Sequence, residues 1–79
     1  MNTLNFMTGL SILMKYKDNP NGYNIGADHD EIYVWATDKP VSEVDLARLY
    51  DLTWFQSGIE TDAEGNPIYD PNESWKAFV

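Results

Sequence analysis

The absence of cysteine constrains the fold of this chain most, because its 79 residues must fold without disulfide bonds. A chain this short buries a smaller share of its surface than a large protein does, so its core is thin. A hydrophobic content of 43% with three tryptophans is nevertheless too high for a disordered chain. We therefore predict one domain over residues 1–79. Oligomerisation or partner binding would increase the surface that this domain buries.

The charge of the chain is strongly negative, since five Lys and Arg residues stand against 13 Asp and Glu residues and give a net charge of −8. This charge repels phosphate backbones and anionic lipids, so we expect no direct binding of nucleic acid or membranes, whereas a basic protein partner is favoured. The sequence shows no signal peptide and no apolar run long enough to span a bilayer. With the lack of cysteine, these features predict a cytoplasmic protein.

Residues 3–17 have the apolar spacing of a helix that stops at the DNPNG turn. Gly9 weakens this prediction, because glycine costs about 1 kcal/mol relative to alanine inside a helix. The predicted apolar face consists of Phe6, Met7, Leu10, Leu13 and Met14.

The segment KPVSEVDLARLYDL predicts a second, capped helix. Ser42 is the expected N-cap, Asp45 its partner in a capping box, and Val41 should pack against Leu46. Arg48 is placed to pair with Asp45 or Asp51. The predicted buried stripe is Leu46, Leu49 and Tyr50.

Three segments are predicted strands: residues 31–37, TWFQSG and SWKAFV. In the first, Ile32 and Val34 share one face, and Tyr33 and Trp35 share the other. The connection from residue 59 to 73 is longer than usual hairpin loops and is typical of functional or mobile segments. We predict an α+β fold in which two helices pack on a small, mostly antiparallel three-stranded sheet.

The stretch ADHDE places the only histidine, His29, among Asp28, Asp30 and Glu31. In an extended strand these side chains alternate between faces, so at most two of them could bind one ion, and no other histidine or cysteine is present. No residue pattern supplies an oriented nucleophile and base. We therefore predict no metal site, no cofactor and no catalytic residues, and assign the stretch to a solvated strand entrance.

The segment DAEGNPIYDPNE places oxygen ligands at calcium-loop positions one, three, five, nine and twelve. Position six is Pro67, where a calcium loop needs glycine for its sharp turn, and no helical pattern precedes the segment. An acidic loop without a bound ion is the favoured interpretation.

The acidic side chains gather at the strand entrance, on the second helix and in the late loop. Such a field can steer a basic partner, and aromatic residues ringed by charge are typical of protein contacts. The spacing of alternate strand carboxylates, about 6.6 Å, also permits mimicry of a DNA strand. Solubility alone is the competing explanation for the acidity. The predicted partner-binding residues are Asp28, Asp30, Glu31, Tyr33, Trp35, Glu60, Asp62, Glu64 and Asp70.

The segments GLSILMKYKDNPNGY, ADHDEIYVWATDKPVSEVDLARLYDLTWF and SWKAFV together resemble small uncharacterised acidic proteins encoded by phages and prophages. The chain departs from that pattern at Thr53, where the pattern has glycine. The resemblance assigns no activity by itself, but small acidic phage proteins are often inhibitors of host defence, and anti-CRISPR proteins are among them. A phage origin would therefore favour a non-enzymatic inhibitor. Its expected partner is a basic host complex, such as a CRISPR effector or other DNA-binding machinery.

Two alternatives remain open from the sequence. A phage structural or regulatory accessory protein would form a homodimer through its aromatic face, so the chain is expected to be a monomer or a homodimer. A metal-dependent enzyme using His29 is the other alternative; it would lose function on His29→Ala while still folding.

Overall fold

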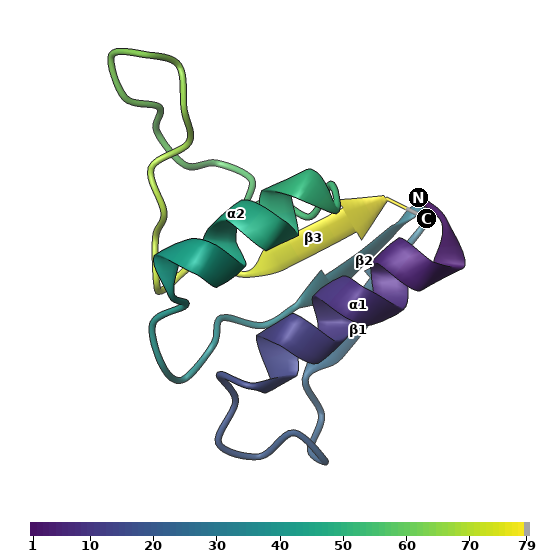
Figure 1. Cartoon of the computed structure of the whole chain (residues 1–79). Helices are drawn as coiled ribbons and strands as arrows, with labels where there is room; N and C mark the ends of the chain where they lie inside the picture. The colour runs from purple at the N-terminus through teal and green to yellow at the C-terminus, as the bar shows by residue number, and fades with distance from the viewer. Residues whose placement is uncertain (79) are drawn as a thin grey trace.

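The computed structural model describes residues 1–78 and contains two helices and three strands. In chain order these elements are α1 (Thr3–Met14), β1 (Ile25–Asp28), β2 (Glu31–Val34), α2 (Glu43–Asp51) and β3 (Trp75–Phe78). The strands form one antiparallel sheet in the order β1-β2-β3, and both helices cover the same face of it (Figure 1). The predicted α+β fold is confirmed.

The strands differ from the prediction in place and extent. β1 was not predicted, because its sequence IGAD has only one residue that favours strands, Ile25, beside a glycine, an alanine and an aspartate. It forms by pairing with β2. β2 ends at Val34, three residues before the predicted end. The predicted strand at residues 53–58 contributes only a single bridge, in which Phe55 pairs with Lys76 of β3.

The core lies between the helices and the sheet and is built around Trp54 and Trp75, each 1% exposed. Tertiary packing supplies most of the stability of such short elements. The other fully or nearly fully buried apolar residues are Ile12, Leu13, Val34, Val41, Leu49 and Ala77.

α1 is shorter than predicted, and Phe6, Leu10, Leu13 and Met14 of its predicted apolar face do contact the core. It begins after Asn2, whose side chain accepts a hydrogen bond from the Asn5 N–H at 2.8 Å, and ends at Met14. The prediction for Met7 was wrong, since this residue is 57% exposed, and Ile12 is buried instead. Gly9 is also buried, because the indole ring of Trp54 packs directly on it.

α2 begins as predicted, but its capping box is incomplete. The Ser42 hydroxyl accepts from the Asp45 N–H at 3.3 Å, whereas the Ser42 N–H donates to the Tyr16 hydroxyl at 3.4 Å. The Asp45 carboxylate therefore does not turn back to the cap. Leu49 is fully buried as predicted, and Leu46 and Tyr50 are half-buried against the core.

The Asp45 carboxylate instead joins α2 to the end of α1. It accepts hydrogen bonds from the Lys15 ammonium at 2.7 Å and from the Tyr16 hydroxyl, and Arg48 lies 3.6 Å away. These partners, Lys15 first, hold the pKa of Asp45 below its ordinary value of 3.8, although burial opposes this shift. The Asp45 side chain is only 8% exposed, whereas the Lys15 side chain is 54% exposed, so the carboxylate is protected from solvent and its cationic partner is not.

α2 ends in a Schellman motif that requires a left-handed residue. The Trp54 N–H donates to the Leu49 carbonyl at 2.9 Å and the Thr53 N–H to the Tyr50 carbonyl at 3.0 Å. Thr53 occupies the left-handed position with φ +68°, which a β-branched residue adopts only under strain. Thr53 is thus a strained residue.

Thr53→Gly is expected to raise the free energy of unfolding by about 1 kcal/mol, because glycine adopts positive φ without strain and this gain exceeds its entropic cost. Urea denaturation of the purified chain measures the change. Thr61→Gly is the matched control: Thr61 is exposed and its φ is not positive, so this variant should not gain stability. Equal stability of Thr53→Gly and the parent chain would contradict the strain.

Candidate partner-binding surfaces

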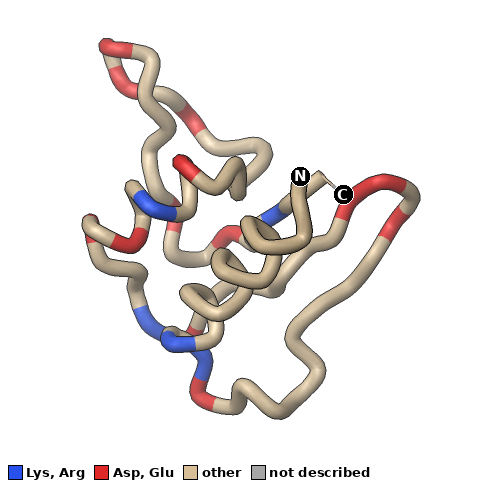
Figure 2. The backbone as a smooth tube through the Cα atoms, turned by 45° about the vertical axis from the view of Figure 1, so that its right-hand side comes forward, with Lys and Arg blue, Asp and Glu red and all other residues tan. Residues whose placement is uncertain are grey.

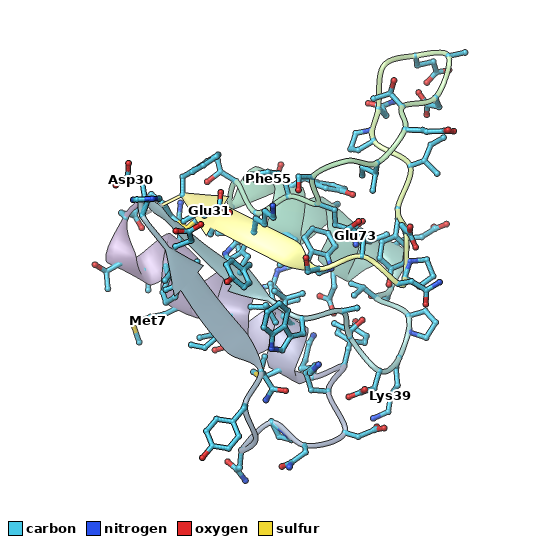
Figure 3. All side chains as sticks on the ribbon, turned by 180° about the vertical axis from the view of Figure 1, so that it is seen from behind. Met7, Asp30, Glu31, Lys39, Phe55 and Glu73 are labelled. Atoms are coloured by element: carbon cyan, nitrogen blue, oxygen red, sulfur yellow. The ribbon has the colours of Figure 1, made fainter. Side chains whose placement is uncertain are left out.

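The face of the sheet opposite the helices is left uncovered (Figure 3). Because side chains alternate along a strand, the full burial of Val34 in the core between the helices and the sheet turns Glu31 and Tyr33 to the other side. Strand register adds the cross-strand partners of these residues from β1 and β3. We define the sheet face as the side chains of Asp28, Glu31, Tyr33, Trp35, Phe55, Lys76 and Phe78.

Aromatic rings on the sheet face form two pairs. Tyr33 and Trp35 lie 5.0 Å apart between ring centroids, and Phe55 and Phe78 lie 5.3 Å apart. Trp35 is 47% exposed and Phe78 is 58% exposed, which is unusual for large apolar residues clustered on one surface. Between the two pairs, the Lys76 ammonium lies 3.7 Å from the Glu31 carboxylate.

Gly26 makes room for one of these rings. It stands opposite Tyr33 in the β1-β2 register, and a Cβ at this position would lie 2.5 Å from Cε2 of the Tyr33 ring. The ring therefore lies against the backbone of β1, where only glycine leaves it space.

The stretch Asp28–Glu31 is a tight turn between β1 and β2, and the prediction of a single extended strand was wrong here. Asp28 pairs with Glu31 across the strands, so these two side chains share the sheet face. His29 lies in the turn with φ +35°, and its Nε2 is 3.7 Å from the Asp28 carboxylate. Within residues 1–78, no three His, Cys, Asp or Glu side chains gather closely enough to hold a metal ion.

The late connection is a second surface, which we call the finger and define as residues 59–70. It projects from the body of the molecule beyond α2 (Figure 1). Thr61 and Pro67 form a bridge, the Ile68 N–H donates to the Glu60 carbonyl at 2.8 Å, and Gly65 has φ +83° in the turn. The finger is thus a short hairpin with its own backbone hydrogen bonds.

The four predicted finger acids have different roles. The Asp62 carboxylate accepts from the N–H groups of Glu64 and Asn66, both at 2.9 Å, and so shapes the turn. Glu60 and Glu64 are exposed. Asp70 is half-buried at the base of the finger, and its backbone exchanges two hydrogen bonds, of 2.7 and 3.1 Å, with the buried Gln56 side chain.

The predicted partner-binding residues therefore belong to two separate surfaces. The structure brings Asp28, Glu31, Tyr33 and Trp35 together on the sheet face, with Asp30 beside them in the turn. The finger acids lie at the opposite end of the molecule from that turn (Figure 2). A single acidic surface containing all nine residues is not formed.

The cationic side chains of the chain are engaged internally. Lys15 and Arg48 contact Asp45, Lys76 contacts Glu31, and Lys39 lies 3.3 Å from Asp18. The Lys17 ammonium donates to the Ala36 carbonyl at 2.9 Å. None of these cations lies within 4.0 Å of a finger carboxylate in the described part of the chain, so the finger presents unneutralised negative charge.

Three residues of the sheet face were missed by the sequence predictions. Lys76 and Phe78 could have been found from the alternation in SWKAFV, where Trp75 and Ala77 take the buried face. Phe55 gave no comparable signal, since its place depends on one bridge to a strand 21 positions later, at Lys76.

Comparison with protein-family models, curated proteins and solved structures finds no match for this chain. None of the helices in residues 1–78 is long and apolar enough to cross a membrane.

Proposed function

We propose that this protein is a non-enzymatic inhibitor that binds a basic surface of a host nucleic-acid-handling complex through its finger. The carboxylates of Glu60, Asp62 and Glu64 would occupy the place of nucleic-acid phosphates on that surface. The resemblance to small phage proteins favours a complex of host defence, such as a CRISPR effector, as the partner.

The distribution of charge carries this proposal. All five Lys and Arg side chains are engaged elsewhere in the fold, while the finger has three acidic residues within five positions and no basic residue. An exposed hairpin with a single sign of charge raises the rate of encounter with an oppositely charged surface. If the acidic residues served only solubility, they could be spread over the body of the molecule and would not need to gather on the finger.

The architecture of the finger supports contact by this element alone. Its backbone hydrogen bonds and the Gln56 contacts at its base restrain its backbone, which reduces the entropy lost on binding. The finger and the β1-β2 turn lie far apart, so their carboxylates do not form one continuous row along which a basic groove could bind (Figure 2). Insertion of the finger alone into such a groove is therefore the favoured mode of binding.

The test is capture of host-cell proteins on the immobilised chain, with identification by mass spectrometry. We expect a nucleic-acid-handling complex that is retained at low salt and lost at about 0.5 M salt, because screening shortens the range of these interactions. The double variant Glu60→Lys, Glu64→Lys should weaken capture by at least about tenfold. Asp62 is left intact because its carboxylate shapes the turn.

The matched control is Glu43→Lys, Asp51→Lys on α2, which changes the net charge by the same amount at two exposed positions. This control should retain most of the binding. Equal loss in both variants, or capture that does not depend on salt, would count against the finger as the contact.

A homodimer formed through the sheet face is the second candidate, favoured by its two uncovered aromatic pairs. Sedimentation analysis separates the two functions. A homodimer should persist at high salt and in the finger variant but dissociate on Trp35→Ala, whereas the proposed inhibitor is a monomer whose capture depends on the finger.

A further inference from the structure

We propose that the sheet face binds an extended segment of the partner protein in which a lysine or arginine is followed four residues later by an apolar residue. This inference rests on the proposed function in one respect, namely that the partner is basic. It concerns a surface separate from the finger and is tested separately.

The sheet face combines exposed aromatic rings with charged groups, as protein contacts do, and the Glu31–Lys76 pair lies between its two aromatic pairs. Two shallow hollows lie on it. One is lined by Asp28, His29, Asp30, Glu31 and Phe78, and the other by Glu31, Tyr33, Trp35, Ser74 and Lys76. Each has a volume of about 260 Å³, which suits a single side chain.

The hollow at the β1-β2 turn is complementary to a cation. Asp28 and Asp30 have no Lys or Arg within 4.0 Å in the described part of the chain, and the partner of Asp28 is only the exposed His29. The ring of Phe78 forms another wall of this hollow. A guanidinium or ammonium group placed here would gain both carboxylate contacts and a cation–π contact.

The hollow at the other end suits an apolar side chain. Its walls include the rings of Tyr33 and Trp35, and its one cationic group, Lys76, is already paired with Glu31. A second cation here would meet Lys76, so an apolar residue is favoured over a basic one.

The separation of the two hollows determines the spacing of the segment. The two hollows adjoin at Glu31, which lines both. The first extends from Glu31 to its cross-strand partner Phe78 and to the turn, and the far end of the second is at Trp35, four residues after Glu31. Four residues of extended chain span about 13 Å, and residues four apart in an extended segment point to the same face. The residue midway between them would lie over the Glu31–Lys76 pair and should be small or polar.

A second copy of this chain is the less favourable occupant. Each copy has a net charge of −8, and a face-to-face dimer would bring two sets of turn carboxylates onto one interface. Like charges brought together at an interface cost binding free energy. A basic segment would neutralise the carboxylates at the turn, whereas a second copy would add negative charge to them.

The test is an NMR titration of the full, ¹⁵N-labelled chain with a synthetic peptide that has blocked ends. In this peptide Leu follows Arg by four residues, and Thr occupies the position midway between them. We expect saturable shifts of the Trp35 indole N–H and of the Gly26 amide beneath Tyr33. The indoles of Trp54 and Trp75, each 1% exposed, should not move. Phe78→Ala should weaken the binding measured at Gly26 by about tenfold.

The matched control peptide has Arg and Leu three residues apart, so that in an extended chain the two side chains point to opposite faces. Equal binding of both peptides, or no shift at millimolar peptide, would overturn the proposal. Shifts of the same resonances on concentrating the protein alone would instead identify a second copy as the occupant. The finger variant should bind the peptide normally, so failure here and failure of the proposed function are distinguishable.

Discussion

Gly9→Ala is expected to lower the free energy of unfolding by about 2 kcal/mol, although alanine normally stabilises a helix by about 1 kcal/mol. The reason is the contact between α1 and Trp54. A Cβ at position 9 would overlap Nε1 and Cδ1 of the indole and would lie 2.7 Å from Cε2. Trp54 cannot move aside easily, because it is 1% exposed and stacked on Phe6 with ring centroids 5.6 Å apart.

Thermal or urea unfolding of four variants checks this prediction: Gly9→Ala, Ser11→Ala, Trp54→Phe, and Gly9→Ala combined with Trp54→Phe. Ser11→Ala, at an exposed position of the same helix, should not destabilise the chain. In a Trp54→Phe background the smaller ring should leave space, so Gly9→Ala should cost much less there. If the cost were the same in both backgrounds, the overlap with Trp54 would not be its cause.

The residues that could be predicted from the sequence are those whose structure depends on near neighbours. Ser42 caps α2 because its hydroxyl reaches an N–H three residues later, and Leu49 is buried because the helical period places it there. The turn chemistry after α1 likewise fixed the end of that helix to within three residues, at Met14.

The features that could not be predicted depend on residues far apart in the chain. Gly9 looked like a weakness of α1 until Trp54, 45 positions later, was found against it. Asp45 has the spacing of a capping box, yet Lys15 and Tyr16 of the α1 end attract its carboxylate more strongly than the cap does. β1 has only one residue that favours strands, Ile25, and forms because β2 pairs with it.

The binding surfaces show the same division. Alternation along β2 correctly placed Tyr33 and Trp35 on one face, together with Glu31. The two-residue turn at His29 could not be predicted. An acidic run before a strand has the same sequence pattern whether the chain stays extended there or turns back on itself. The separation of the finger from this turn follows from the path of the chain around α2 and β3, for which no local pattern exists.

Asp45→Asn is expected to lower the free energy of unfolding by about 2 kcal/mol near neutral pH, because charge-assisted hydrogen bonds to a nearly buried carboxylate are each stronger than neutral ones. The amide would keep a contact with the Tyr16 hydroxyl but lose the attraction to Lys15 and Arg48. Asp51→Asn, at an exposed position of the same helix, is the control and should change little.

The dependence on pH distinguishes this charge interaction from a simple packing effect. The pKa of Asp45 in the folded chain lies below its ordinary value of 3.8, so the unfolded chain takes up the proton first as the pH falls. The stability due to the ionised carboxylate is therefore fully present above the ordinary pKa and is lost as the pH falls through the lower, folded value. The difference between parent chain and Asp45→Asn should be constant from about pH 7 to about pH 5 and should shrink below about pH 4. Urea unfolding at a series of pH values measures this difference, and one that stayed constant down to about pH 2 would show that Asp45 acts through its shape and not through its charge.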